Sequence, residues 1–371
     1  MIGKERYMIK YLSLFSGIGA FEKALKNIGI EYKLVGFSEI DKYAVKSYCA
    51  IHGVDESLNL GDVKSIDVSK LLDLDIDLIT HGSPCQDFSV AGHQAGGDKG
   101  SETRSSLMWC TVDIVEKIKP KYVIWENVKN LLGKKHRHNF DDYIKIMDEL
   151  GYNSYYKVLN AKDYGIPQNR ERVYTVSIRK DIDLINGYEF EFPEKIELKL
   201  RLKDMLEDVT EVDEKYYLSD KLIKFFERHN KEQEKKGNGF RWETTTGEGI
   251  AKSITTRVGA CRTDDNYIKV IGEVDIKGHD CIKRIYDVNG IAPTLTDMQG
   301  GHRQPKVEIN ERVRKLTPKE CFRLMGFKDE DFMKARGAGI SDTQLYKQAG
   351  NSIVVQVLEA VMGVIHLETK T

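Results

Sequence analysis

Residues 11–20, YLSLFSGIGA, run from an apolar, strand-like segment into a turn that contains Gly17 and Gly19. The amphipathic pattern of residues 21–28 then predicts a helix, and Gly29 stands just past its end. A strand that passes through a glycine turn into a helix is the opening unit of a βαβ fold. This stretch therefore predicts an α/β protein whose first strand lies within a parallel sheet.

The alternation of strands and helices continues through the first half of the chain. Strand-like runs occur at residues 33–37, 76–80, 121–125, 157–159 and 173–178, and residues 107–118 have a helical pattern. Asp41 is placed to cap the helix that follows the second strand. This rhythm predicts a doubly wound, mostly parallel sheet, and because it stops near Arg179 we assign residues 1–185 to the first domain.

The remainder of the chain divides into two parts. Residues 186–310 are rich in charges, Gly and Thr, with short strand-like pieces such as residues 268–271, and we interpret them as a smaller, mostly β domain. Helical patterning returns in residues 311–371, where Thr317 and Glu320 form a capping-box pattern. Residues 354–367 predict a final helix with one apolar face, which we expect to pack on the first domain.

Composition limits the class of protein. The chain has 371 residues, 40% of them hydrophobic and 31% charged, with a formal net charge of −1, which argues against a uniformly basic surface. No apolar run is long enough for a membrane span, and the first residues contain no signal-peptide core, so we expect a cytoplasmic protein. The six cysteines form no Cys-x-x-Cys pair, so we expect reduced thiols and no metal site. We interpret His136, Arg137 and His138 as a solvated basic loop.

A thiol and a carboxyl group follow two of the predicted strands. Cys85 lies in GSPCQ, residues 82–86, after the strand at 76–79, and Glu126 follows the strand at 122–125. Because the carboxyl ends of parallel strands meet at one edge of a sheet, we expect both side chains to face one cleft. A nucleophile and an acid beside a glycine-rich turn suit covalent chemistry on a small planar ring.

The glycine turn also indicates a cofactor. Gly17 and Gly19 allow the backbone to approach a ligand, and Glu39, at the end of the second strand, can accept hydrogen bonds from ribose hydroxyls. The dinucleotide fingerprint would need a glycine at the position of Glu22, whose carboxylate should repel a pyrophosphate. The pattern therefore favours S-adenosylmethionine over NAD, with Asp62 as a candidate partner for the adenine amine.

The chain resembles the bacterial DNA (cytosine-5)-methyltransferases over nearly its whole length. The matching segments, in the order found in that family, are residues 14–19 (LFSGIG), 84–86 (PCQ) with 88–89 (FS), 126–128 (ENV), 168–174 (QNRERVY), 314–320 (RKLTPKE) with 323–327 (RLMGF), and 348–353 (QAGNSI). The resemblance implies a class I S-adenosylmethionine-dependent methyltransferase fold. It also implies that residues 186–310 are the target-recognition domain, and that residues 311–371 return to the catalytic domain.

The resemblance implies methyl transfer to carbon 5 of a cytosine that is flipped out of duplex DNA. Cys85 would attack carbon 6 as a thiolate, and Glu126, with a raised pKa, would bond to or protonate ring nitrogen 3. Arg170 and Arg172 would brace the carbonyl oxygen of the base and orient Glu126. The cofactor-binding residues implied are Phe15, Ser16, Gly17, Gly19, Glu39, Ile40, Asp62, Pro84, Leu107, Asn351 and Ser352, with Ile40 in place of an aromatic residue over the adenine.

The glycine-rich residues 90–100 resemble a mobile catalytic loop that closes over DNA. Candidate DNA contacts, in and around this loop and in the recognition region, are Gln86, Ser89, Gln94, Arg104, Arg284, Thr294, Thr296, Gln299 and Arg303. Arg284 could pair with a guanine in the major groove or could contact only phosphate. The residues do not specify the recognition sequence.

Two other functions use the same motifs. One is a tRNA cytosine-5 methyltransferase, which the length and Gly/Thr pattern of the recognition region disfavour. The other is a DNA-binding regulator without catalytic activity, which the intact Cys85, Glu126, Arg170 and Arg172 disfavour. We expect a nucleoid-associated bacterial monomer, and any cognate restriction endonuclease would act as a separate protein.

Overall fold

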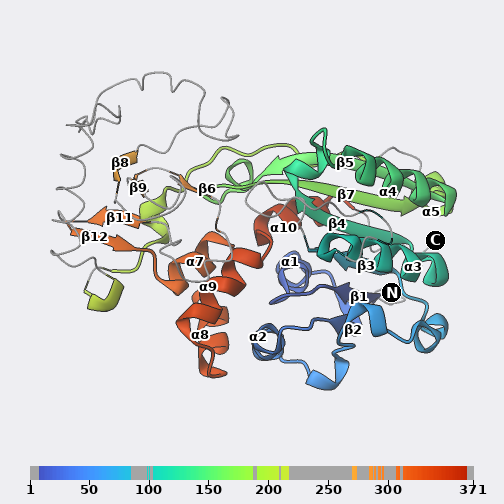
Figure 1. Ribbon diagram of the computed structural model, residues 1–371, viewed down its shortest axis with the longest axis horizontal. Coiled ribbons are helices and arrows are strands. Elements are labelled where there is room, and N and C mark those ends of the chain that lie inside the picture. The colour runs from blue at the N-terminus through green and yellow to red at the C-terminus, as the bar shows by residue number, and fades with distance from the viewer. Residues whose placement is uncertain are drawn as a thin grey trace, which may run out of the picture.

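A computed structural model describes residues 8–84, 98, 100, 103–186, 190–208, 210–216, 270–273, 284–286, 288–289, 291–293, 295, 306–309 and 312–365 (Figure 1). Its largest element is a six-stranded sheet with the strand order β2-β1-β3-β4-β7-β5. The strands are β1 (Ile9–Leu14), β2 (Tyr32–Ser38), β3 (Leu78–His81), β4 (Tyr122–Val128), β5 (Tyr152–Asn160) and β7 (Glu171–Arg179). The strands from β2 to β4 are parallel, and β7 runs antiparallel to β4 and β5. The predicted α/β fold with a mostly parallel sheet is confirmed.

Alternate residues of the strands face two separate cores. Leu78 and Ile124 belong to a cluster with residues of α1 (Ala20–Asn27) and α10 (Val355–Gly363). Their chain neighbours Ile79 and Val123 belong to a second cluster with residues of α3 (Met108–Ile118) and α4 (Arg137–Glu149). This period of two is expected for strands buried on both faces, and it explains why their sequences are continuously apolar.

Helix ends follow local capping chemistry. Asp41 caps α2 (Lys42–His52), because its Oδ1 accepts hydrogen bonds from the backbone N–H groups of Tyr43 and Ala44, at 2.9 and 3.4 Å. This confirms the prediction from sequence. The remaining helical elements of this half are α5 (Lys180–Asn186) and the 3-10 turns η1 (Glu56–Leu58), η2 (Val63–Ser65), η3 (Val68–Leu74), η4 (Arg104–Leu107), η5 (Lys129–Leu132) and η6 (Ala161–Tyr164).

The interpretation of residues 136–138 as a solvated loop is wrong. Arg137 begins α4, and its Nε lies 2.7 Å from Oδ1 of Asp141, one turn later. His136 is 1% exposed, whereas the exposed His138 pairs with Asp98 at 2.7 Å. The first residues of this helix are charged or polar and gave no helical pattern. Its apolar side is formed by later residues, Phe140, Tyr143 and Met147. Among the described residues, no group of His, Cys, Asp and Glu could hold a metal ion.

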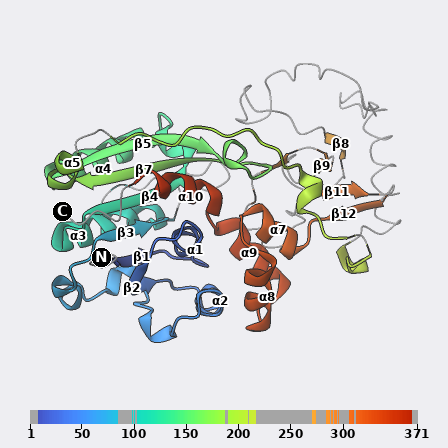
Figure 2. The same cartoon turned by 180° about the vertical axis from the view of Figure 1, so that it is seen from behind.

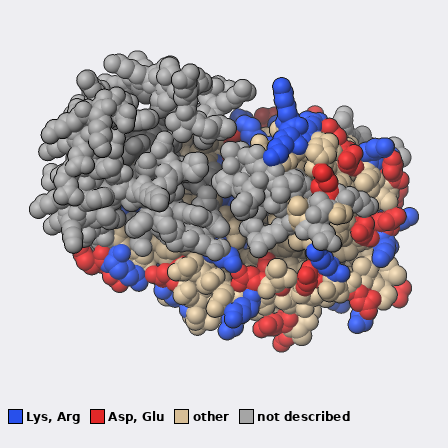
Figure 3. Space-filling view, viewed as in Figure 1, with Lys and Arg blue, Asp and Glu red and all other residues tan. Residues whose placement is uncertain are grey.

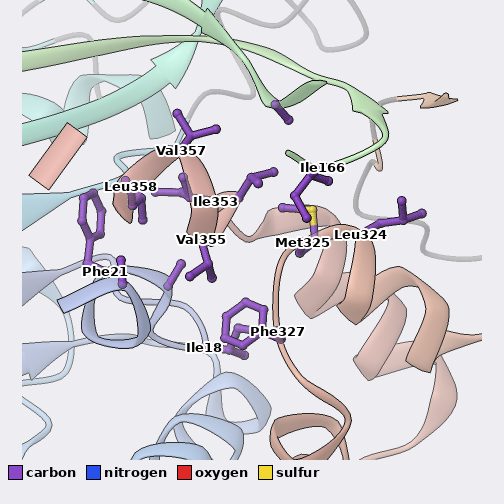
Figure 4. Close-up of a cluster of buried hydrophobic side chains, with 14 of the residues drawn as sticks. Ile18, Phe21, Ile166, Leu324, Met325, Phe327, Ile353, Val355, Val357 and Leu358 are labelled. Carbon is purple, nitrogen blue, oxygen red and sulfur yellow. The ribbon is translucent and has the colours of Figure 1, made fainter. Parts of the chain in front are cut away.

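The helices of the C-terminal segment pack against α1. The segment forms α7 (Pro318–Leu324), α8 (Asp329–Gly337), α9 (Asp342–Asn351) and α10, and the capping box at Thr317 and Glu320 is present. The Lys23 ammonium of α1 pairs with Asp331 of α8 at 2.8 Å, and both side chains are buried. Figure 4 shows Phe21 near Leu358 and Ile18 beside Phe327, where the two ends of the chain share one core.

A second sheet is formed by residues that follow the first domain. It contains β8 (Val270–Glu273), β9 (Arg284–Tyr286), β11 (Lys306–Ile309) and β12 (Arg312–Lys315), in the order β12-β11-β9-β8, so β12 lies in this sheet although it follows residue 310. A short parallel pairing of β6 (Gln168–Asn169) with β10 (Ala292–Pro293) connects this region to the first domain. The 3-10 turns η7 (Leu202–Met205) and η8 (Glu214–Tyr216) complete the described part.

Figures 1 and 2 place α7, α8 and α9 between the two sheets. Figure 3 shows acidic and basic side chains interspersed over the described surface, as expected for a net charge of −1. None of the helices within the described ranges is long and apolar enough to cross a membrane.

Candidate active site

The glycine turn after β1 has the backbone conformation that close approach to a ligand requires. Phe15, Gly17 and Gly19 have φ values of 53°, 57° and 81°, in the left-handed region. A Cβ on Gly19 would lie 2.1 Å from Nε2 of His52, so this position excludes any side chain. The His52 ring in turn lies against the turn, with Nε2 3.0 Å from the carbonyl oxygen of Ile18.

Glu39 holds this turn from the end of β2. Its carboxylate accepts hydrogen bonds from the backbone N–H groups of Gly17, Ile40 and Asp41, at 2.9, 2.9 and 2.8 Å. Burial raises the pKa of Glu39, while these three hydrogen bonds oppose the shift. Because two carboxylate oxygens offer about four acceptor positions, a ligand hydroxyl can still bind there.

Asn59 is a member of this group that the sequence analysis missed. Its Oδ1 accepts from the N–H groups of Glu39 and Gly61, at 3.2 and 3.1 Å, and its Nδ2 donates to the Glu39 carbonyl at 3.1 Å. An Asn that directly precedes Leu60 and Gly61 is a sequence signal for such side-chain-to-backbone bonding. Ile40 is 75% exposed beside this turn, and the exposed Asp62 caps η2.

Glu22 lies in the first turn of α1, as expected from the sequence. The side chain is 1% exposed, and Oε1 accepts a hydrogen bond from the hydroxyl of Tyr48 at 2.8 Å, between α1 and α2. The repulsion of a pyrophosphate by this carboxylate stays a prediction.

Glu126 lies in the buried part of β4, and 8% of it is exposed. Its Oε1 lies 3.2 Å from Nε of Arg172 on the neighbouring strand β7. Burial raises the pKa of Glu126, and the charges of Arg172 and then Arg170 oppose the shift. The raised pKa expected from the sequence is thus present, and its cause is desolvation.

The chain that leads to Cys85 passes directly beside this carboxyl group. A Cβ built on Gly82 would lie 3.9 Å from Oε2 of Glu126 and 3.4 Å from Cδ1 of Ile353. Residues 82–84 are the last described residues before Cys85. The carboxyl group, the segment before the thiol and the C-terminal return segment therefore meet at one place.

Arg170 has a different position from Arg172. Its side chain is buried, Nη1 donates to the carbonyl of Leu295 at 2.6 Å, and Nη2 donates to the carbonyls of Gly350 and Ser352 at 3.2 and 2.7 Å. It therefore joins β7, the recognition region and the end of α9. Arg172 is the arginine that contacts Glu126.

Gln168 is a second residue that the sequence analysis missed. It is fully buried, Nε2 donates to the carbonyl of Leu324 at 2.8 Å, and Oε1 accepts from the N–H of Leu295 at 3.1 Å. A glutamine that opens the QNRER segment gives no local sign of these distant partners.

The other candidate residues have the following places. Pro84 and Leu107 are half-buried, Asn351 is exposed at the end of α9, and Ser352 is 7% exposed. Only the backbone is described for Arg104, in η4, and for Arg284, in β9. Outside the described residues lie Cys85, Gln86, Ser89, Gln94, Thr294, Thr296, Gln299 and Arg303.

The fold and this site define a class of protein, the class I methyltransferase fold. A methyltransferase from Entamoeba histolytica, EhMeth, matches with a TM-score of 0.68, covering 97% of this chain and 98% of that one at 18% sequence identity. The Dnmt2 methyltransferase of S. pombe matches with a TM-score of 0.64, again at 18% identity and with 97% and 98% coverage.

The sequence defines the family within that class. The model of the family described as "C-5 cytosine-specific DNA methylase" matches residues 9–366. The chain therefore belongs to this family, and its activity is that of a DNA cytosine-5 methyltransferase. The orphan methyltransferase M.SPRI of Bacillus phage SPR is 38% identical, covering 95% of this chain and 96% of the relative. The type II methyltransferase M.HpaII of Haemophilus parainfluenzae is 32% identical, with 96% and 88% covered.

Proposed function

We propose that this enzyme methylates carbon 5 of a cytosine flipped out of a specific short duplex DNA sequence, with S-adenosylmethionine as methyl donor and Cys85 as nucleophile. The observation that carries this proposal is the buried Glu126 carboxyl group with its raised pKa, beside the chain that leads to Cys85. A buried carboxyl group at that place can hold a proton and donate it, whereas a solvent-exposed carboxyl group would already be ionised near neutral pH.

The reaction needs a nucleophile because carbon 5 of cytosine does not react unaided. The Cys85 thiolate attacks carbon 6, and the electron pair of the ring double bond moves toward carbon 5 while Glu126 supplies a proton to nitrogen 3. Carbon 5 takes the methyl group and then loses its own proton to a base. That electron pair restores the double bond, expels Cys85 as a thiolate, and nitrogen 3 returns its proton.

Arg172 supports Glu126 in this scheme. Its ion pair with Oε1 orients the carboxyl group, so that Oε2 is directed toward Gly82 and the base. Arg170, through its three backbone carbonyl partners, holds the recognition region and the end of α9 against β7. We assign Arg170 a positioning role and Arg172 the closer contact.

The turn after β1 fits a nucleoside-containing methyl donor. The left-handed backbone at Phe15 and Gly17 provides a close approach to the ligand. Glu39, held by backbone hydrogen bonds, provides a ribose acceptor, and the exposed Ile40 provides an apolar cover. S-adenosylmethionine, when bound, supplies an electrophilic methyl group. The other residues proposed to line its site are Ser16, Gly19, Asp62, Pro84, Leu107, Asn351 and Ser352.

Residues 186–310 are proposed to read the DNA sequence, with Arg284 as a base or phosphate contact and the segment after Cys85 as a second DNA contact. We propose residues 1–185 as the catalytic domain and 311–371 as its return segment. We further propose a monomer in which one site handles one flipped base, with any cognate endonuclease as a separate chain.

The decisive experiment is methyl transfer to unmethylated bacterial DNA, with conversion sequencing to locate 5-methylcytosine. The matched variants are Cys85→Ala and Cys49→Ala, since Cys49 is a half-buried free cysteine in α2 that is not among the proposed site residues. We expect methylation at one short motif that is abolished by Cys85→Ala and retained by Cys49→Ala. Methylation of tRNA with none on duplex DNA would overturn the proposal.

A further inference from the structure

Ser83 lies two residues before Cys85 and is held by the strand that carries Glu126. The indole N–H of Trp125 donates to Oγ of Ser83 at 3.0 Å. On the other side of Glu126, Nδ2 of Asn127 lies 3.3 Å from the carbonyl oxygen of Ser83 and 3.4 Å from its Oγ. Ser83, Trp125 and Asn127 are 3%, 1% and 1% exposed, so water does not compete for these hydrogen bonds.

Trp125 is itself fixed by aromatic packing. Its ring stacks on His81, its register partner on β3, with a centroid distance of 5.5 Å and an interplanar angle of 2°. From the other side Tyr143 and Phe140 of α4 lie at 4.4 and 6.0 Å. His81 is fully buried, and burial lowers its pKa to about 3, so this ring is uncharged at working pH. The indole N–H therefore has one well-defined position.

These contacts connect the two chemical groups of the site through adjacent residues. Trp125 directly precedes Glu126, and Ser83 precedes Pro84 and Cys85. Along β4, successive side chains point to opposite faces, so Trp125 faces the α3/α4 core while Glu126 faces Arg172 and Gly82. The hydrogen bond from Trp125 to Ser83, on one face of β4, therefore holds the segment before Cys85 close to Glu126 on the other face.

We infer that Trp125 and Ser83 are positioning residues for methyl transfer, and that their hydrogen bond holds the segment that precedes Cys85 against the strand that carries Glu126. The inference rests on the proposed roles of Cys85 and Glu126. Displacing a reacting group by about 1 Å can reduce a rate about a hundredfold, so a single buried hydrogen bond at this place controls kcat rather than substrate binding.

The test compares Ser83→Ala with a control that removes a similar bond elsewhere. Ser177 on β7 is fully buried, its Oγ lies 2.7 Å from Oγ of Ser154, and it also interacts with the Tyr143 hydroxyl, so Ser177→Ala alters the packing around Trp125 but leaves the Ser83 hydrogen bond in place. We expect Ser83→Ala to lower kcat about tenfold, with KM for S-adenosylmethionine within about twofold of wild type. Ser177→Ala keeps kcat within about twofold, and Ser83→Thr, which retains the hydroxyl, recovers most of the lost rate.

A merely structural role for Ser83 gives a different result. Ser83→Ala and Ser177→Ala would then lower kcat equally, or Ser83→Thr would be no better than Ser83→Ala, and either outcome overturns the inference. Trp125→Phe removes the same N–H while keeping a ring against His81 and Tyr143, so it provides a second measurement if Ser83→Ala is too unstable. All variants are assayed below their unfolding midpoints.

Cys85→Ala in the same assays separates this inference from the proposed function. If Cys85→Ala remains active, the nucleophile assignment fails whatever Ser83→Ala does. If Cys85→Ala is inactive while Ser83→Ala matches the Ser177→Ala control, only the positioning inference fails.

Discussion

Glu39, which is half-buried, and Glu126, which is buried, are carboxyl groups near the ends of two strands of one sheet, and their surroundings differ. Burial raises the pKa of both. Glu39 is opposed by three backbone N–H donors in fixed positions, whereas Glu126 is opposed by guanidinium charges, with Arg172 at 3.2 Å. Three backbone donors fix a carboxylate in place, which suits binding. A group with a single ion-pair contact is less constrained and can take up and release a proton, which suits catalysis.

Glu320 is a third carboxyl group, and its acceptor positions are more fully occupied than those of Glu39. It is completely buried and accepts hydrogen bonds from both Nη atoms of Arg314, at 2.9 and 2.7 Å, and from the N–H groups of Thr317 and Glu207, at 2.8 and 2.9 Å. With every acceptor oxygen used twice, it has no capacity left for a ligand. The degree of saturation thus distinguishes a structural, a binding and a catalytic carboxyl group.

Among the substitutions that test this comparison, Glu126→Gln should have the largest effect, a fall in kcat. The amide keeps the shape of the side chain but cannot transfer a proton, and general acid catalysis contributes about 10²–10⁴-fold to rate. We expect kcat to fall by that factor while the Kd for S-adenosylmethionine stays within about twofold, as measured by single-turnover kinetics and calorimetry. Glu116→Gln, an exposed residue of α3, is the matched control and should leave both values unchanged. Retention of kcat in Glu126→Gln would contradict the assignment.

Glu320→Ala should have the next largest effect, and on stability. It leaves the Arg314 guanidinium buried with its bidentate partner removed, and breaking a buried ion pair costs about 3–5 kcal/mol. Chemical denaturation should show this loss of unfolding free energy. Glu330→Ala is the control, because Glu330 is exposed and lies 3.9 Å from Lys23, and it should change stability by less than about 1 kcal/mol. Equal effects of the two substitutions would show that Glu320 is not structurally important.

Glu39→Gln should weaken cofactor binding moderately. The amide oxygen can accept some of the three backbone bonds, but the charge that strengthens them is lost, and a charge-assisted bond exceeds a neutral one by about 1 kcal/mol or more. We expect the Kd for S-adenosylmethionine to rise about tenfold while kcat at saturation changes less than about threefold. Calorimetry measures the Kd for S-adenosylmethionine, and steady-state methyl transfer at saturating cofactor measures kcat. A loss of kcat equal to that of Glu126→Gln would remove the distinction between the two carboxyl groups.

Local features of the fold could be predicted well from the sequence, whereas the tertiary partners of individual side chains could not. The glycine turn, the Asp41 cap and the Thr317 capping box are local patterns, and the structure confirms them. Helix α4 was missed because its first residues are charged or polar. Gln168 and Ser83 act through partners far away in the chain, which no local pattern contains, whereas Asn59 combines a local bond to Gly61 with bonds to Glu39.

The smallest expected effect is the pH dependence of stability at Glu126. Because its pKa is raised in the folded state, the folded protein binds this proton more tightly than the unfolded chain does. Stability therefore falls as pH rises from the unfolded value through the folded one, and above the folded pKa the wild type carries the full penalty of a buried charge. Glu126→Gln has no such proton, so it should be more stable than wild type at pH 8 and equal to it at pH 4.

Urea unfolding of both proteins at the two pH values measures this difference, and all other titrating groups cancel because the proteins share them. The opposing effect is the loss of the carboxylate partner of Arg172, which would destabilise the variant at high pH. That side chain is 16% exposed, so it can keep part of its hydration. A variant less stable than wild type at pH 8 would mean that the ion pair outweighs desolvation. The ionised form of Glu126 would then be favoured at that pH, and the acid role proposed for it would lose its physical basis.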